Sequence, residues 1–128
     1  ISEKINKDTK TLILSYGSIV NSINEAIIEM RAEKYISVYC PIEIEELKNY
    51  LKKYNIKKIK KIFIIEEHLE ENGMSEVYGN LIKKIAPNVI VKKLGIKNKN
   101  PHLVGSRDYL LKKNHLDKIS IKNQLIYY

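Results

Sequence analysis

Short apolar runs alternate with longer amphipathic stretches along the chain. The short runs are typical of buried strands, and they lie at Thr11–Tyr16, Tyr35–Cys40, Lys60–Ile65 and Val89–Leu94. The stretches between them carry apolar residues at steps of three and four, which predicts helices that each turn one face toward a core. These helices lie at Ile19–Lys34, Glu43–Tyr54 and Ser75–Ala86. Pro41 marks the exit from the second strand and Pro87 stops the third helix.

The two ends of the chain add further elements. Residues Ile1–Asn6 predict a short edge strand that turns through Lys7-Asp8-Thr9 into the next strand as an antiparallel hairpin. The polar segment Lys97–Pro101 predicts a loop. The last predicted helix starts at Ser106 or Asp108 and runs through Lys113, with a helical tail near Ile119–Ile126.

Strands that alternate with helices at this spacing predict a parallel sheet covered on both faces. With the initial hairpin, the expected architecture is a three-layer α/β/α domain with a five-stranded mixed sheet, mostly parallel with one antiparallel edge strand. The 128 residues suffice for one domain. Because the chain begins at Ile1 without an initiator methionine or a signal-peptide pattern, we expect residues 1–128 to be a fragment of a longer chain.

Composition narrows the classes of partner. The formal net charge of +8 suggests nucleic acid, but only Arg31 and Arg107 among the 23 basic residues are arginine. The lysines form scattered doublets, which are typical of a solvated face, so we predict no nucleic-acid partner. No apolar run approaches the roughly 18 residues that span a bilayer, so we predict no membrane partner. The single cysteine, Cys40, forms no intramolecular disulfide and fits a cytoplasmic location.

Charged residues follow the third strand, where Glu66, Glu67 and His68 are succeeded by Gly73. In open α/β sheets ligands and partner domains meet the fold at the carboxyl ends of the strands. A histidine beside carboxylates has acid/base capability, because it titrates near neutrality. Consecutive residues do not face one another, however, so the three cannot all serve one centre. The plainer interpretation is that they only end the strand.

These residues also carry a family resemblance. Ile64-Ile65-Glu66-Glu67-His68 followed by Gly73 resembles the V-x-x-E-E-H…G-G segment in the C-terminal domain of transketolase-like, thiamine-diphosphate-dependent enzymes. Thr11 to Ser18 resembles the opening strand and turn of that domain, and Lys93-Leu94-Gly95 is a further point of agreement. Gly105-Ser106-Arg107-Asp108-Tyr109-Leu110-Leu111 resembles its closing helix, and is most like deoxyxylulose-phosphate synthase. The resemblance covers about Ser2 to about Leu125.

Two segments depart from the family pattern. The family usually has a glycine pair, a small or apolar residue and another glycine, where this chain has Asn72-Gly73-Met74-Ser75. The usual Pro-hydrophobic-Asp step after the second strand is represented only by Cys40-Pro41-Ile42-Glu43. Both differences weaken an assignment to one enzyme while leaving the expected fold unchanged.

The resemblance implies a role without catalytic residues in this domain. Thiamine diphosphate and Mg²⁺ would be bound by other domains of the full-length enzyme. This domain would pack against the pyrimidine-binding domain and support a homodimer. The interface or substrate-proximal candidates are then Glu66, Glu67, His68, Gly73, Arg107 and Asp108. The parent substrate stays open between transketolase, deoxyxylulose-phosphate synthase and a 2-oxo-acid dehydrogenase β-type subunit.

An alternative is a free-standing metabolite-binding or regulatory domain. Gly17 and Ser18 open a predicted helix, whose free N–H groups can receive a phosphate. The plainer interpretation is that Ser18 caps the helix. His102 and His115 have no partner ligands at zinc spacing, so no metal is predicted. The Gly-x-Gly-x-x-Gly, Walker and Gly-x-Ser-x-Gly patterns are absent from the sequence.

Overall fold

The computed structural model describes residues 5–41, 43–54, 56–69, 74–96 and 116–127. Its strands are β1 (Thr11–Ser15), β2 (Ile36–Tyr39), β3 (Lys61–Leu69) and β4 (Ile90–Ile96). Its helices are α1 (Ile19–Glu29), α2 (Ile44–Lys53), α3 (Met74–Ile85) and α5 (Lys118–Tyr127), with a 3₁₀ turn at Ile56–Lys58. The predicted helix from Ser106 or Asp108 to Lys113 lies outside the described residues. None of the described helices is long and apolar enough to cross a membrane.

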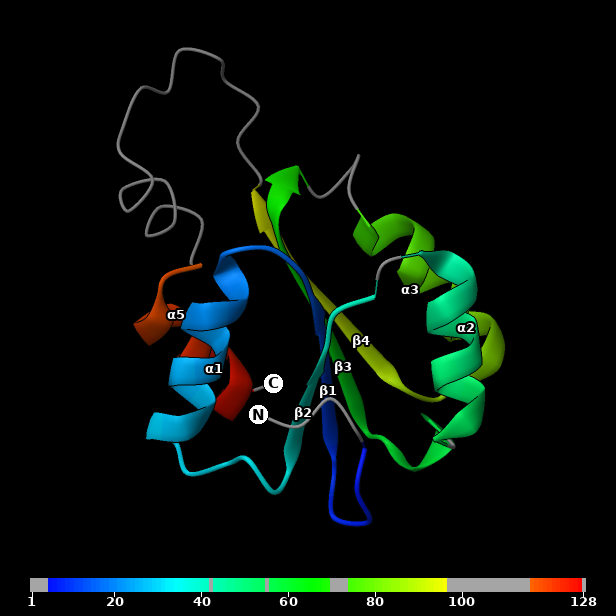
Figure 1. Ribbon diagram of the computed structural model, residues 1–128, viewed down its shortest axis with the longest axis horizontal. Helices are drawn as coiled ribbons and strands as arrows, with labels where there is room; N and C mark the ends of the chain where they lie inside the picture. The colour runs from blue at the N-terminus through cyan, green and yellow to red at the C-terminus, as the bar shows by residue number, and fades with distance from the viewer. Residues whose placement is uncertain (1–4, 42, 55, 70–73, 97–115, 128) are drawn as a thin grey trace.

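All described strands run parallel in one sheet of order β2-β1-β3-β4 (Figure 1). In register, Leu12 of β1 lies between Ser37 of β2 and Ile62 of β3. The chain leaves β1 for β2 on one side and then crosses to β3 and β4 on the other. The order of strands therefore reverses between β1 and β3, which makes the carboxyl ends of these two strands the topological switch point of the sheet.

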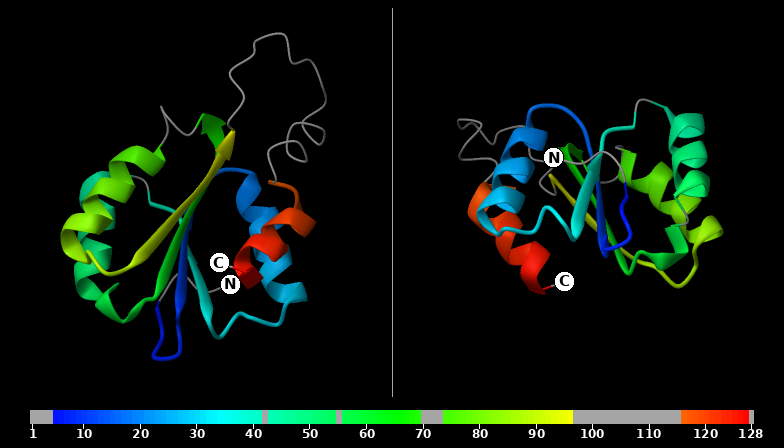
Figure 2. Two further views of the ribbon diagram at one scale, coloured as in Figure 1. Left: turned by 180° about the vertical axis from the view of Figure 1, so that it is seen from behind. Right: turned by 60° about the horizontal axis from the view of Figure 1, so that its bottom comes forward.

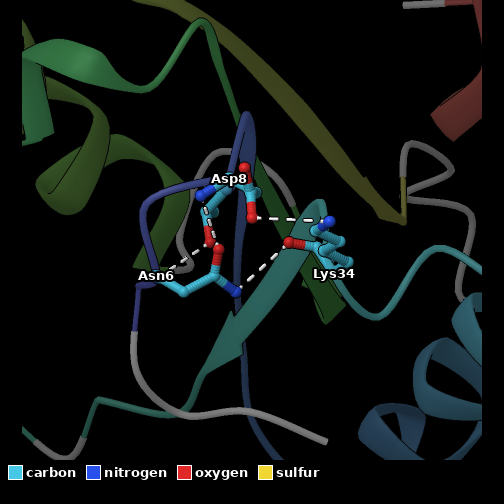
Figure 3. A network of polar contacts seen from close by, with 4 residues as sticks. Asn6, Asp8 and Lys34 are labelled. Carbon is cyan, nitrogen blue, oxygen red and sulfur yellow. Dashed lines mark hydrogen bonds and ion pairs between the residues drawn. The ribbon is translucent and has the colours of Figure 1, made fainter.

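The prediction of a five-stranded mixed sheet is wrong: the sheet that the structure describes has four strands, all parallel. The reason is that β1 is a central strand, paired with β2 on one edge and β3 on the other, so no edge is left for a hairpin partner. Residues 1–4 of the predicted edge strand lie outside the described residues, and residues 6–9 form a turn instead (Figure 3). There the Asn6 side-chain oxygen accepts the Asp8 N–H at 2.7 Å, and the Asn6 amide donates to the Lys34 carbonyl at 3.2 Å. Lys34 Nζ also lies 3.7 Å from Asp8 Oδ2.

Helices cover both faces of the sheet, so the predicted three-layer arrangement is confirmed (Figure 2). Successive residues of a strand point to opposite faces. Leu12 and Leu14 accordingly pack with α2 and α3, and Ile13 packs with α1 and α5. Each apolar cluster includes buried residues of a helix pair: Leu47, Tyr50, Leu51, Tyr78 and Ile82 on one face, and Ile19, Ile23, Ala26, Ile27 and Ile121 on the other.

Helix α1 ends at Glu29, five residues before the predicted end at Lys34. Arg31 takes a left-handed backbone conformation with φ of 54°. The Ala32 N–H then bonds to the Ile27 carbonyl at 3.1 Å, and the Arg31 N–H bonds to the Ile28 carbonyl at 3.0 Å. This pair of bonds is the Schellman motif, which satisfies the last carbonyls of a helix and turns the chain away.

Strand β3 extends four residues beyond its predicted end at Ile65. It therefore contains Glu66, Glu67 and His68, and the interpretation that these residues only end the strand is wrong. Its pairing with β4 is regular up to Ile65, shifts, and resumes where Leu69 lies opposite Ile96. The extension follows from β4, which continues alongside and supplies backbone partners that the sequence of β3 does not reveal.

Candidate functional site

The switch point brings two of the predicted sites together, one from β1 and one from β3. Ser15 ends β1 and donates from its buried hydroxyl to the Ile65 carbonyl of β3 at 2.6 Å, which ties the two strand ends to each other. Gly17 then turns the chain into α1 with φ of 84°. These ends lie at the upper edge of the sheet in Figure 1.

Ser18 and Glu67 meet at this edge. The Ser18 hydroxyl donates to Glu67 Oε1 at 3.4 Å, at the long end for such a bond. Ser18 occupies the N-cap position of α1 as expected, but its side chain makes no capping bond to the helix. Helix α1 has no acidic residue in its own first turn. The Glu67 carboxylate lies beside the helix N-terminus instead, where the helix dipole favours negative charge.

Glu66 is fully buried and belongs to the opposite side of the sheet. The raised pKa values of two tyrosines show which residues lie near Glu66. Burial raises the pKa of Tyr16, and the negative charges of Glu66 and Tyr78 raise it further. Burial also raises the pKa of Tyr78, followed by the charges of Glu46 and Glu66. A carboxylate that disfavours the ionised form of both phenols lies within electrostatic reach of both rings.

Strand β2 contributes a further tyrosine to this side. The Tyr39 hydroxyl donates to Glu46 Oε1 of α2 at 2.8 Å. The Tyr39 ring stacks on Tyr50, with centroids 3.7 Å apart and planes 5° from parallel. Hereafter the tyrosine–glutamate cluster means Tyr16, Tyr39, Glu46, Glu66 and Tyr78.

Sequence reasoning missed all the tyrosines of the cluster, although a signal was present. Tyr16 directly follows β1 and Tyr39 is the last residue of β2. Polar residues at the carboxyl ends of adjacent parallel strands converge on one edge of the sheet, so these tyrosines could have been grouped with Glu66. Tyr78 gave no such signal, because it lies inside α3 at a position that reads as part of a buried helical face.

The cluster is suited to positioning and binding. Both phenols with a raised pKa keep their protons at neutral pH, so they donate hydrogen bonds and do not act as bases. Tyr39, Tyr78 and Glu66 are buried, while Tyr16 keeps 38% of its surface exposed. An incoming group can therefore reach the cluster at Tyr16.

The other predicted residues lie outside the tyrosine–glutamate cluster or outside the described residues. His68 lies in β3 between Glu67 and Leu69. Gly73, Arg107 and Asp108 lie outside the described residues, as do His102 and His115. Across the described part of the chain, no group of three or more His, Cys, Asp or Glu residues is placed to hold a metal ion.

Comparison with known proteins gives a likeness in fold. No family model matches the chain, and no curated protein matches its sequence. Among solved structures, it matches a chain described as "Split gene transketolase, inactive beta4 tetramer", with a TM-score of 0.76 and 16% sequence identity. The match covers 94% of this chain and 39% of that chain. The fold is thus that of one part of a transketolase chain, and this chain spans well under half of its length.

Proposed function

We propose that residues 1–128 form the C-terminal domain of a transketolase-like, thiamine-diphosphate-dependent transferase. The observation that carries this proposal is the extent of the structural match, which covers 94% of this chain but only 39% of the matched chain. Such a ratio is expected when one domain is compared with a larger subunit. The order of strand, turn and helix motifs along the sequence, which resembles the same domain, supports the proposal independently.

In this role the domain supplies no catalytic residue. Thiamine diphosphate and Mg²⁺ belong to other domains of the full enzyme, which transfers a two-carbon ketol unit or forms deoxyxylulose phosphate. The domain packs against the pyrimidine-binding domain and supports a homodimer. Glu67, His68, Gly73, Arg107 and Asp108 contribute to that interface. Glu66 is fully buried, so it acts from inside by holding the tyrosine–glutamate cluster in place.

The alternative of phosphate binding at Gly17 and Ser18 is less well supported. The Glu67 carboxylate already lies 3.4 Å from the Ser18 hydroxyl, and a phosphate at this helix end would meet its negative charge. A thermal-shift titration separates the two roles. Millimolar phosphosugars that stabilise the domain, with the effect lost in Ser18→Asp, would favour a metabolite-binding domain.

The test of the main proposal is an assay of the complete gene product. The coding sequence on both sides of residues 1–128 is determined, and the full protein, with any companion chain, is purified with thiamine diphosphate and Mg²⁺. We expect ketol transfer or deoxyxylulose-phosphate synthesis. The matched neighbour is described as a split-gene product and as an inactive tetramer, so a chain without its complement is expected to be inactive.

A full product that binds no thiamine diphosphate would contradict the proposal. Glu67→Gln in the complete enzyme is the sharper probe of the interface. It should weaken assembly, seen as a concentration-dependent loss of activity that high protein concentration restores. The same substitution at Glu76, exposed on α3, is the matched control.

A further inference from the structure

A cavity of about 720 Å³ opens at the amino ends of β3 and β4, the edge of the sheet opposite to the switch point. Two short segments line it: the residues that lead into β3, and the turn between α3 and β4. Its volume lies within the range of about 300–1,000 Å³ that is typical of small-molecule sites. The lining residues are Lys58, Ile59, Lys60, Ala86, Pro87, Asn88, Val89 and Ile90.

The lining combines an apolar floor with a cationic rim. Ile59 and Ala86 are buried beneath the cavity, and Ile90 leaves 60% of its surface exposed. Lys58 and Lys60 are exposed, and none of the described residues that line the cavity is acidic. The end of α3 adds a partial negative charge of about one half, against two full positive charges from the lysines. The cavity therefore favours an anion.

A second, smaller cavity strengthens this positive field. It has a volume of about 220 Å³, shares Ile90 with the first, and is lined by Lys61, Phe63 and Lys92. Two further lysines therefore lie near the same exposed isoleucine. Positive charges gathered around a concave surface attract anions and raise their local concentration.

Backbone hydrogen bonds hold both walls of the larger cavity. The Ile59 N–H bonds to the Ile56 carbonyl at 2.9 Å and the Lys60 N–H to the Lys10 carbonyl at 3.0 Å. On the other wall, the Val89 N–H bonds to the Ala86 carbonyl at 3.2 Å. The Ile90 N–H joins the two walls through the Lys60 carbonyl at 3.1 Å. The cavity is thus formed before any ligand enters, which is usual for ligand sites.

We propose that this cavity binds a small organic acid with an apolar body. Its acidic headgroup pairs with Lys58 and Lys60, and its body covers Ile59, Val89 and Ile90. Neither the fold likeness nor the proposed domain role requires this site. It lies at the far edge of the sheet, so its test stands apart from that of the proposed function.

Amide NMR titration of the chain tests the proposal, with phenylbutyrate as the probe. We expect saturable shifts at residues 58–60 and 86–90 at up to about 10 mM probe. Acetate carries the headgroup alone and phenylbutanol the apolar body alone, and each should bind at least about tenfold more weakly. Equal binding of phenylbutanol, shifts centred elsewhere, or no shift would each overturn the proposal.

Substitutions at exposed positions identify the site without unfolding the chain. Lys58→Glu and Lys60→Glu should each weaken phenylbutyrate binding at least about tenfold. Lys52→Glu makes the same change in net charge at an exposed position of α2 and should leave binding unchanged. Ile90→Ser should weaken binding, whereas Ile119→Ser on α5 should not. An equal loss in the lysine variants and in Lys52→Glu would show nonspecific attraction and refute the site.

Discussion

Gly17 matters at the scale of a single residue because its φ of 84° lies in the left-handed region. Apart from its own chain neighbours, no atom of the described residues lies within 4 Å of where a Cβ would stand, so a larger residue meets no clash there. The expected cost is therefore purely conformational. Gly17→Ala should lower the free energy of unfolding by about 1 kcal/mol.

Urea denaturation of Gly17→Ala and Gly17→Asn measures this cost. Asparagine tolerates the left-handed conformation better than alanine, so the asparagine variant should lose less stability. An equal loss in the two variants would mean that something other than backbone conformation decides at this position.

The tyrosine–glutamate cluster predicts a dependence on alkaline pH. Burial and the charges of Glu46 and Glu66 raise the pKa of Tyr78 above its ordinary value near 10. The folded state thus holds this proton more tightly than the unfolded state. The contribution to stability is complete below about pH 10 and is lost as the pH rises from there through the folded pKa.

Tyr78→Phe removes that titration. Its unfolding free energy should fall less steeply above about pH 10 than that of the unchanged chain. Tyr35→Phe, at an exposed tyrosine, is the control and should keep the steeper fall. Parallel alkaline curves for Tyr78→Phe and the unchanged chain would rule out this account of the cluster.

At the scale of elements, the end of α1 carries an unusual residue for its conformation. Arg31 occupies the left-handed position of the Schellman motif, where glycine is commonest. The left-handed conformation costs a non-glycine residue roughly 1–2 kcal/mol, and glycine loses about 0.5–1 kcal/mol more backbone entropy on folding. Arg31→Gly should therefore be more stable than Arg31→Ala by about 0.5–1 kcal/mol.

The comparison with alanine is the appropriate one for Arg31. Both variants lose the guanidinium and its positive charge near the end of α1, so their difference isolates the backbone. Chemical denaturation under identical conditions provides the measurement. If alanine matched or exceeded glycine, the strain inferred at this position would be absent.

Ion pairs join α5 to α1 across their contact. Glu29 Oε2 lies 3.0 Å from Lys122 Nζ and 3.2 Å from Lys118 Nζ. Hydrogen bonds from Lys122 and Lys118 lower the pKa of Glu29. The pairing therefore stabilises the fold above the usual carboxyl range and is lost as the pH falls through the lowered pKa.

Glu29→Gln should loosen the attachment of α5. Amide hydrogen exchange within Lys118–Tyr127 should become faster, and high salt should produce the same change in the unchanged chain. Glu33→Gln, exposed beyond the end of α1, should have no such effect. Unchanged exchange in Glu29→Gln would show that apolar contacts alone, such as those of Ile121, hold α5.

At the scale of the whole molecule, the sequence correctly predicts the features that depend on neighbouring residues along the chain, such as the face of the sheet on which a residue lies. The alternation of Leu12, Ile13 and Leu14 assigns residues to the two faces of the sheet, and both clusters obey it. Pairing between strands is not local. No feature of Ile1–Asn6 reveals that β1 is central, with both edges occupied, so the hairpin was predicted in error. The extension of β3 likewise depends on β4.

The candidate site divides in the same way. Glu66 and Glu67 could be found from the sequence because charge interrupts an apolar strand. In the structure, Glu67 contacts Ser18, whereas Glu66 lies near the tyrosines. The sequence could not reveal this difference, because it arises from contacts between residues far apart in the chain. In the sequence alone, Ser18 looks like an ordinary helix cap and the tyrosines look like ordinary core residues.

Helix α5 exposes two large apolar side chains on one of its faces. Helix α5 buries Ile121 against the sheet, yet it leaves Ile119 and Ile126 68% and 58% exposed. Residues 119 and 126 are seven apart and so lie on one face, opposite to the buried one. Large apolar side chains exposed together on one helix face are expected where another part of an assembly covers them.

Ile119→Ser combined with Ile126→Ser should therefore separate assembly from stability. Exposed substitutions change the unfolding free energy by only about 0.5 kcal/mol, so the domain should fold as before. Sedimentation of the complete gene product should show weaker association of its subunits, because the apolar contact is lost. Val77→Ser, at an exposed apolar residue of α3 on the other face of the sheet, should leave association unchanged. If association survived the double substitution, the assembly would have to use the switch-point edge without α5, and Glu67→Gln would become the decisive variant.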